Sequence, residues 1–380
     1  MKLASGPALA AIATLFGALV GCPGPSGPSG GLEAASPSSS AQAIINGESC
    51  GEDVEPTAVA IIADGTFDFG NGQGFDFSQP LCTGTLIAPD VVLLAAHCLD
   101  LSALVLGFAQ PTRADFYVTF EADLSRYSAA DPQGPPLPLP ESAIPVRDRV
   151  AHPSFDIQAL GEGTGGTEND IALLFLEVNV TDVQPEIVIT KTEAEQLDVG
   201  SAVTIAGWGQ QTADQQPPPG TVGVKKCGST TLDELGPTLM QVGEASASTR
   251  KCHGDSGGPT YTEVTTSSSI KRRVIGVTSR AYSAALDCGA GGVDTRVDAF
   301  LEFIDDEMSA RCDDDSRTFC AVPGIIPASF FDGSSAEGEG EGEGVGDVAL
   351  DTGCPQGCSS APVDAAAGLG LLLLLRRRRR

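Results

Sequence analysis

The chain has 380 residues, and 22 lysines and arginines against 50 aspartates and glutamates give it a formal net charge of −28. So acidic a chain repels phosphate backbones, which excludes nucleic acid as a partner. Glycine and proline make up about 19% of the residues, below the share typical of general disorder, and 41% are hydrophobic and can fill a core. Short runs of Val, Ile, Leu and Thr, broken by Gly and Pro, predict an all-β body with disordered tails.

The first 43 residues predict export. Lys2 precedes an apolar run over residues 8–20 that is too short to span a membrane, so residues 1–22 are expected to be a signal peptide. The run ends in Leu-Val-Gly-Cys, which resembles the bacterial lipobox and implies lipidation of Cys22. A signal peptide with a chance cysteine is the alternative. Residues 23–43, rich in Gly, Pro and Ser, predict a tether or propeptide.

The last 69 residues mirror the organisation of the first 43. Residues 312–353 are expected to hold a cysteine loop and an acidic Gly/Glu linker. Residues 354–380 combine two cysteines, eleven apolar residues and five arginines, and resemble a MYXO-CTERM sorting tail. Eleven residues make a helix of about 16 Å against a hydrocarbon core of about 30 Å, which favours a processed tail over a weak permanent anchor. The two ends predict membrane association through processed anchors, at the cell surface or outer membrane, with release to the extracellular space as the other outcome.

The middle of the chain carries six short motifs in a fixed order. They are IING at 44–47, VLLAAHCL at 92–99, NDIALL at 169–174, AGWG at 206–209, GDSGGP at 254–259 and GVDTRV at 292–297. With these motifs the sequence resembles the trypsin/chymotrypsin family of serine endopeptidases, in a domain expected over residues 44–311. The resemblance implies two antiparallel six-stranded β-barrels with the active site between them, and a short C-terminal helix from Asp298 to about Glu307.

Acyl transfer needs a hydroxyl nucleophile, a base and a group that orients the base. The resemblance implies that His97 is the base, Asp170 the orienting carboxylate and Ser256 the nucleophile. It also assigns the oxyanion hole to the backbone amides of Gly254 and Ser256. His152 is expected to be structural.

Eleven cysteines in an exported chain predict a disulfide framework with one cysteine left over. The family resemblance implies the pairs Cys50–Cys227, Cys82–Cys98 and Cys252–Cys288, and Cys312 with Cys320 is expected to close a local loop. Metal binding is disfavoured because short Cys-x₂₋₄-Cys spacing occurs only in the tail. No cofactor is expected.

The resemblance also implies activation by cleavage. A new α-amino group at Ile44 would fold inward and pair with Asp255, so the chain is expected to be a zymogen. The residue before the cut is Ala43, with no Arg or Lys nearby. This predicts self-cleavage or activation by a protease selective for small residues.

Several residues are expected to bind substrate, and the specificity they predict is not tryptic. The set consists of Arg250, Lys251, His253, Ser279, Arg280, Ala281, Gly292 and Asp294. Arg250 stands where the family places the pocket base, which disfavours Arg or Lys in the substrate and favours a small or an acidic side chain. If Asp294 neutralises Arg250, the small residue is favoured; Arg250 pointing to solvent is the further alternative.

The sequence therefore predicts an exported, monomeric serine endopeptidase that acts on proteins or peptides. The alternatives are a catalytically inactive binding protein on the same fold and a structural or adhesive surface protein. Two other features are expected to have no chemical role: the acidic run 313–315 as a solvated loop, and the glycine-rich segment 161–166 as a loop insertion before Asp170.

Overall fold

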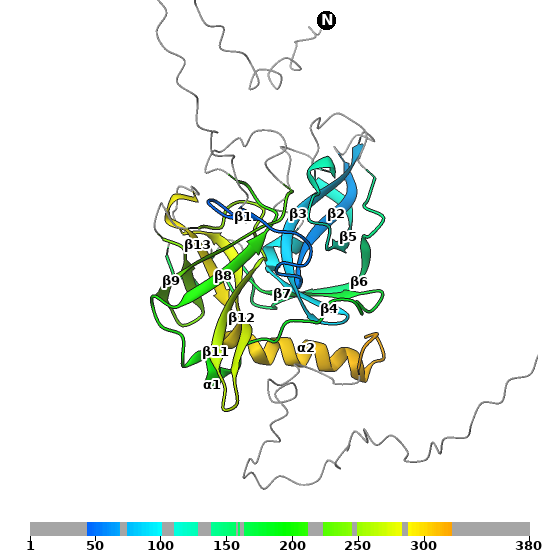
Figure 1. Cartoon of the computed structure of the whole chain (residues 1–380). Helices are drawn as coiled ribbons and strands as arrows, with labels where there is room; N and C mark the ends of the chain where they lie inside the picture. Colours follow the sequence, from blue (N-terminus) through cyan, green and yellow to red (C-terminus); the bar gives the residue numbers. More distant parts are fainter. Residues whose placement is uncertain are drawn as a thin grey trace, which may run out of the picture. The chain divides into compact units, whose positions relative to one another are not determined.

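The structure is a computed structural model of the whole chain (Figure 1). It describes residues 44–68, 74–100, 110–127, 138–156, 159, 163–211, 223–244, 249–282 and 288–320. The expected signal peptide with Cys22, the propeptide, the acidic linker and the sorting tail lie outside the described residues. No helix within the described ranges is long and apolar enough to cross a membrane.

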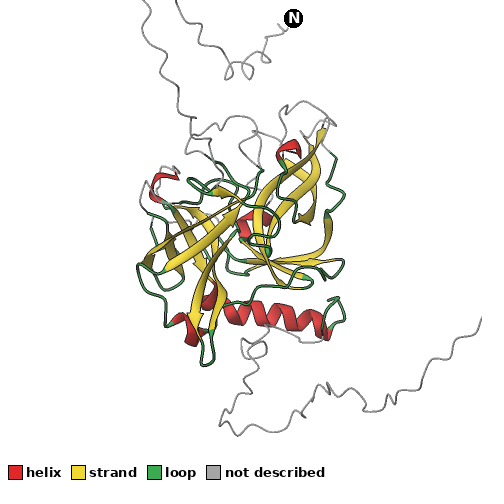
Figure 2. Ribbon diagram, viewed as in Figure 1, coloured by secondary structure: helices red, strands yellow, loops and turns green. Residues whose placement is uncertain are grey.

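The first half of the described chain forms a closed antiparallel barrel in the order β2-β3-β4-β7-β6-β5. Figure 2 shows that strands make up most of the regular structure of the described body. Its strands are β2 (Ala58–Asp68), β3 (Gly74–Ala88), β4 (Val91–Leu94), β5 (Gln110–Thr119), β6 (Ile144–Ala151) and β7 (Ala172–Leu176). Every residue of β4 and β7 is buried, and Val91 pairs with Phe175 at one end of their shared ladder. These two apolar runs are therefore central to the core on which the site is built.

The second half forms another barrel. Its strands are β8 (Ala202–Gly207), β9 (Lys226–Leu235), β10 (Leu239–Val242), β11 (Pro259–Thr265), β12 (Ile270–Ala281) and β13 (Gly292–Arg296). They run in the order β9-β10-β13-β12-β11-β8, and pairing of β8 with β9 closes the ring. The short β1 (Glu48–Ser49) adds to β9, and the helix α1 (Lys191–Ala194) starts with a capping box between Thr190 and Glu193. The two six-stranded barrels confirm the predicted fold class.

The C-terminal helix is longer than predicted and begins later. Residues Val297–Phe300 form a 3-10 turn, and α2 then runs over Leu301–Asp313. Ile304 and Met308 of this helix are buried. Near its end, the Arg311 guanidinium lies 4.1 Å from the centre of the Phe175 ring, so packing against the first barrel continues beyond the predicted end at Glu307.

The segment after α2 is fastened to the first barrel by a buried ion pair. Arg317 Nη2 donates to Asp90 Oδ1 at 3.0 Å, and both side chains are fully buried. Asp90, in the turn between β3 and β4, also accepts hydrogen bonds from the backbone amides of Thr318 and Phe319, each at 3.0 Å. One carboxylate therefore binds three successive residues of this segment.

Four disulfides occur among the described residues. They join Cys50 to Cys227, Cys82 to Cys98, Cys252 to Cys288, and Cys312 to Cys320. These are the four pairs that the sequence analysis expected.

Candidate active site

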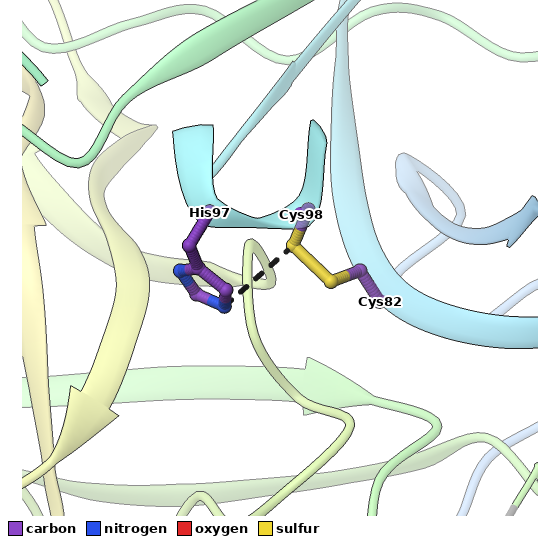
Figure 3. Close-up of side chains that lie close together, drawn as sticks. All are labelled: Cys82, His97 and Cys98. Atoms are coloured by element: carbon purple, nitrogen blue, oxygen red, sulfur yellow. Dashed lines mark hydrogen bonds between the residues drawn. A yellow bond between two sulfur atoms is a disulfide. The ribbon is translucent and has the colours of Figure 1, made fainter. Parts of the chain in front are cut away.

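His97 lies in a 3-10 turn, Ala96–Leu99, directly after β4. Figure 3 shows its ring beside the disulfide of Cys82 and Cys98, with Nε2 3.9 Å from Cys98 Sγ. The two sulfurs and the imidazole are close enough together to suggest a metal site. Because both sulfurs are consumed in the disulfide, neither offers the thiolate that a metal would need. The disulfide instead ties the turn that carries His97 to β3.

Asp170 is the centre of a buried hydrogen-bond network around His97. His97 Nδ1 lies 2.7 Å from Asp170 Oδ2, and the His97 backbone amide donates to Oδ1 at 2.8 Å. Ser279 Oγ donates to Oδ2 at 2.6 Å, and Thr295 Oγ1 donates to the Asp170 carbonyl at 2.9 Å. An ionised carboxylate only accepts hydrogen bonds, so the proton of a neutral His97 ring sits on Nδ1 and Nε2 stays basic.

The pair also sets the ionisation of both groups. Burial of the His97 ring favours its neutral form, but the Asp170 charge and hydrogen bond outweigh this, and the pKa of His97 is raised above 6.5. Burial would raise the pKa of Asp170, yet the charge of His97 and the hydrogen bonds from His97 and Ser279 hold that pKa below 3.8. Asp170 is therefore a carboxylate at neutral pH.

The segment around Ser256 is held to the first barrel through β3. Thr83 donates its backbone amide to the Ser256 carbonyl at 2.8 Å and its hydroxyl to the Gly254 carbonyl at 3.2 Å. Gly254 has a φ of +93°, and a Cβ there would lie 2.8 Å from the Gly209 Cα. Only glycine fits this conformation and this approach without strain. Because Thr83 follows Cys82, the same strand anchors both the Ser256 segment and the His97 turn.

Asp255, the residue before Ser256, is fully buried. Its Oδ1 accepts the backbone amide of Gly209, and its Oδ2 accepts that of Cys252, both at 2.9 Å. Burial nevertheless raises the pKa of Asp255 to about 7. Ile44 is also fully buried, with a φ of +48° that is unusual for a β-branched residue.

The charged residues of the expected pocket form a buried ion pair. The sequence left open whether Asp294 neutralises Arg250; in the structure the Asp294 carboxylate is bound by Lys251, whose Nζ lies 2.7 Å from Asp294 Oδ2. Lys251 Nζ also donates to Thr260 Oγ1 at 2.6 Å. Arg250 Nε donates instead to the Cys288 carbonyl at 2.8 Å. Asp294 pairs with Thr278 of β12, and its carboxylate faces the buried Lys251 and Thr260.

The remaining expected pocket residues take varied positions. His253 is exposed, and Ala281 is half-buried at the end of β12. Gly292 starts β13, and a Cβ there would lie 3.4 Å from Lys251 Cβ. Arg280 is bound through Nε to Glu168 at 2.8 Å, with its side chain 8% exposed.

Sequence reasoning missed Glu168, Thr83 and Thr295. All three act on the site through the fold: Thr83 and Thr295 hold backbone carbonyls, and Glu168 holds Arg280. Glu168 stands two residues before Asp170, and this proximity was the only sign in the sequence that it could act on the site. Its partner, 112 residues later, was not predictable without the strand register.

Comparison with known proteins agrees with this geometry. The trypsin family model matches residues 44–304, most of the chain. Human Serine protease 56 is 30% identical over 61% of this chain, which spans 35% of that protein's length. Rat prostatic glandular kallikrein-6 is 25% identical over 57% of this chain and 74% of its own length. Mouse kallikrein 1-related peptidase b3 is 25% identical over 74% of this chain and 94% of its own length. The chain therefore belongs to the trypsin family of serine endopeptidases.

Proposed function

We propose that this protein hydrolyses peptide bonds through an acyl-enzyme, with Ser256 as nucleophile, His97 as base and Asp170 as the orienting carboxylate. The observation that carries the proposal is the 2.7 Å contact between His97 Nδ1 and Asp170 Oδ2, because it leaves Nε2 free to take a proton. In acylation, Ser256 Oγ attacks the substrate carbonyl while Nε2 accepts the hydroxyl proton. His97 then donates that proton to the leaving amine, and a water molecule, activated by the same Nε2, releases the acid product.

The developing oxyanion is proposed to be bound by the backbone amides of Gly254 and Ser256. The positive φ of Gly254 supports this, because it turns that peptide unit in a way a residue with a Cβ would resist. Loss of one such donor costs on the order of 10²–10³ in kcat.

Activation is proposed to follow cleavage between Ala43 and Ile44. The buried Asp255 carboxyl, with its pKa of about 7 in the uncut chain, is the group that a new α-amino charge would hold ionised. A buried charge pair of this kind suits a switch better than a source of stability, since removing one partner costs about 3–5 kcal/mol. Self-cleavage or a protease that accepts Ala before the bond would make the cut.

The proposed specificity is for a small or an acidic residue before the scissile bond. Its support is the cationic Arg250 at the expected pocket base, where a substrate Arg or Lys at 4 Å would be repelled by about 4 kcal/mol at an effective dielectric constant of 20. Because Asp294 is bound to Lys251, its charge does not favour the small residue over the acidic one. Profiling the activated enzyme on a peptide library separates the two, since Arg250→Ala should abolish only an acidic preference.

Export to the cell surface or outer membrane, as a monomer anchored by processed ends, is part of the same proposal. The four disulfides of the described chain support an oxidising compartment.

A fluorophosphonate probe tests the proposed function directly. The activated protein should be labelled at Ser256, and Ser256→Ala should abolish both labelling and peptide hydrolysis. An activated wild-type protein that is not labelled would instead indicate a binding protein on a protease fold. A surface role that is unchanged in Ser256→Ala would indicate a structural protein.

A further inference from the structure

We propose that the buried ion pair of Arg280 and Glu168 positions Asp170, and that the glycine segment 163–166 leaves room for this pair. This inference rests on the proposed function, because it assigns the pair a role in the reaction through the orientation of His97. Neither residue touches the His97 ring in the described network, so both are positioning residues and not catalytic ones.

The pair is well connected. Arg280 Nε donates to Glu168 Oε1 at 2.8 Å, and Nη2 donates to the Gly163 carbonyl at 2.7 Å. Glu168 is fully buried, and its Oε2 has no hydrogen-bond partner within the described residues. The Arg280 charge is therefore the main compensation for a carboxylate removed from water.

The glycine segment fits around this pair, which gives it a role beyond that of the loop insertion expected from the sequence. A Cβ on Gly166 would collide with Glu168 Oε2. Gly163 has a φ of +60°, and its carbonyl receives the second arm of Arg280. A residue with a side chain at Gly166 would displace the Glu168 carboxylate from Arg280.

Two neighbouring contacts link the pair to the site. Glu168 and Asp170 lie two residues apart on one segment, and Arg280 and Ser279 are adjacent at the end of β12. Glu168 bonds to Arg280, while Asp170 accepts the Ser279 hydroxyl at 2.6 Å. These two contacts fix the segment before and at Asp170 against the same strand.

The backbone between the two carboxylates makes a tight turn. Asn169 has a φ of +47°, in the left-handed region that asparagine adopts more readily than most non-glycine residues. Its side-chain amide donates to the carbonyls of Ser154 at 3.0 Å and Thr167 at 2.8 Å. If Glu168 is released, the turn at Asn169 can relax, and the Asp170 carboxylate moves relative to His97 Nδ1.

The test compares Glu168→Gln with a matched control, Glu193→Gln. Glu193 on α1 is also buried and bonds to an arginine of β12, Arg273, at 2.9 Å. Among the described residues its side chain bonds only to Arg273 and Thr190, which are outside the proposed site. Both variants are expected to lose stability. Only Glu168→Gln should lower kcat, by about ten- to a hundredfold, because a small misplacement of a positioned group has effects of this size. KM for a small ester substrate should change less.

A second readout follows the hydrogen bond itself. In the Ser256→Ala background, the downfield proton NMR resonance of His97 Nδ1 should shift or broaden in Glu168→Gln and remain unchanged in Glu193→Gln. Arg280→Lys keeps the charge beside Glu168 but loses the Nη2 hydrogen bond to the Gly163 carbonyl, so it should give an intermediate kcat. This variant serves as the test if Glu168→Gln does not fold.

The inference is overturned if Glu168→Gln keeps the wild-type kcat and His97 resonance, or if Glu193→Gln loses as much of either. It also fails if Arg280→Lys is kinetically identical to the wild type. These outcomes are distinct from failure of the proposed function, which would appear as absence of Ser256 labelling in the wild-type protein.

Discussion

Substitution of Asp255 by Asn should change how the stability of the uncut chain depends on pH. The Asp255 pKa is raised from 3.8 to about 7 in the folded chain by burial. Between these two values the folded state holds a proton that the unfolded state has released, so stability falls as pH rises from about 4 to about 7 and is level above that. The displacement corresponds to about 4 kcal/mol at full deprotonation. Asparagine carries no titrating proton, so Asp255→Asn should remove this loss.

The assay is urea unfolding of Ser256→Ala and of Ser256→Ala/Asp255→Asn, at intervals from pH 4 to pH 8. Ser256→Ala prevents self-cleavage, and other titrating groups cancel in the difference between the two curves. The single variant should lose up to about 4 kcal/mol relative to the double variant as the pH rises. The amide will also change the hydrogen bond from Gly209 or Cys252, but that offset does not depend on pH. Parallel curves would refute the reasoning, because they would mean that Asp255 ionises at its ordinary pKa in the buried site.

Three further predictions concern other buried charges. Asp170→Asn should lower kcat by about 10⁴-fold. Because the Asp170 charge raises the pKa of His97, the variant should also lower that pKa and move the acid limb of the kcat/KM profile to lower pH. An acid limb that does not move would contradict the assignment of Asp170. Lys251→Met should cost about 3–5 kcal/mol in urea unfolding by leaving a buried carboxylate unpaired, and combining it with Asp294→Asn should recover most of the loss. Arg317→Leu should cost a similar amount while the kcat of the folded enzyme is retained, and a fall in kcat would show that the C-terminal loop also supports the site.

The sequence was sufficient for the features that depend on local patterns. The apolar run of β4 is followed by His97, and the apolar run of β7 is preceded by Asp170. The sequence therefore placed both residues next to core strands, where the structure has them. The disulfide pairs also followed from the family resemblance, because the cysteines stand at the distances from the His97 and Ser256 motifs at which the family has its disulfides.

Features that depend on strand register were not predictable in the same way. Lys251 and Asp294 are 43 residues apart, and they meet only because the chain segment at Lys251 packs against β13, which a local pattern does not predict. The helix end was also misplaced, because its length depends on contacts of Arg311 with Phe175 and Asp148 on the first barrel. No local sequence signal encodes such contacts.

Three of the buried ion pairs join parts of the chain that are distant in the sequence and close to functionally or structurally important segments. Lys251–Asp294, Arg280–Glu168 and Arg317–Asp90 each join segments that are at least 43 residues apart, and one or both partners are fully buried in each pair. Such pairs add little net stability, because desolvation offsets their attraction, but separating the partners leaves a charge stranded in the interior. Wrong strand registers and wrongly docked segments are therefore penalised much more than the native arrangement is favoured. Two of the three pairs lie beside residues proposed for the pocket and for the His97–Asp170 contact, where a shift of one residue would be most damaging to function.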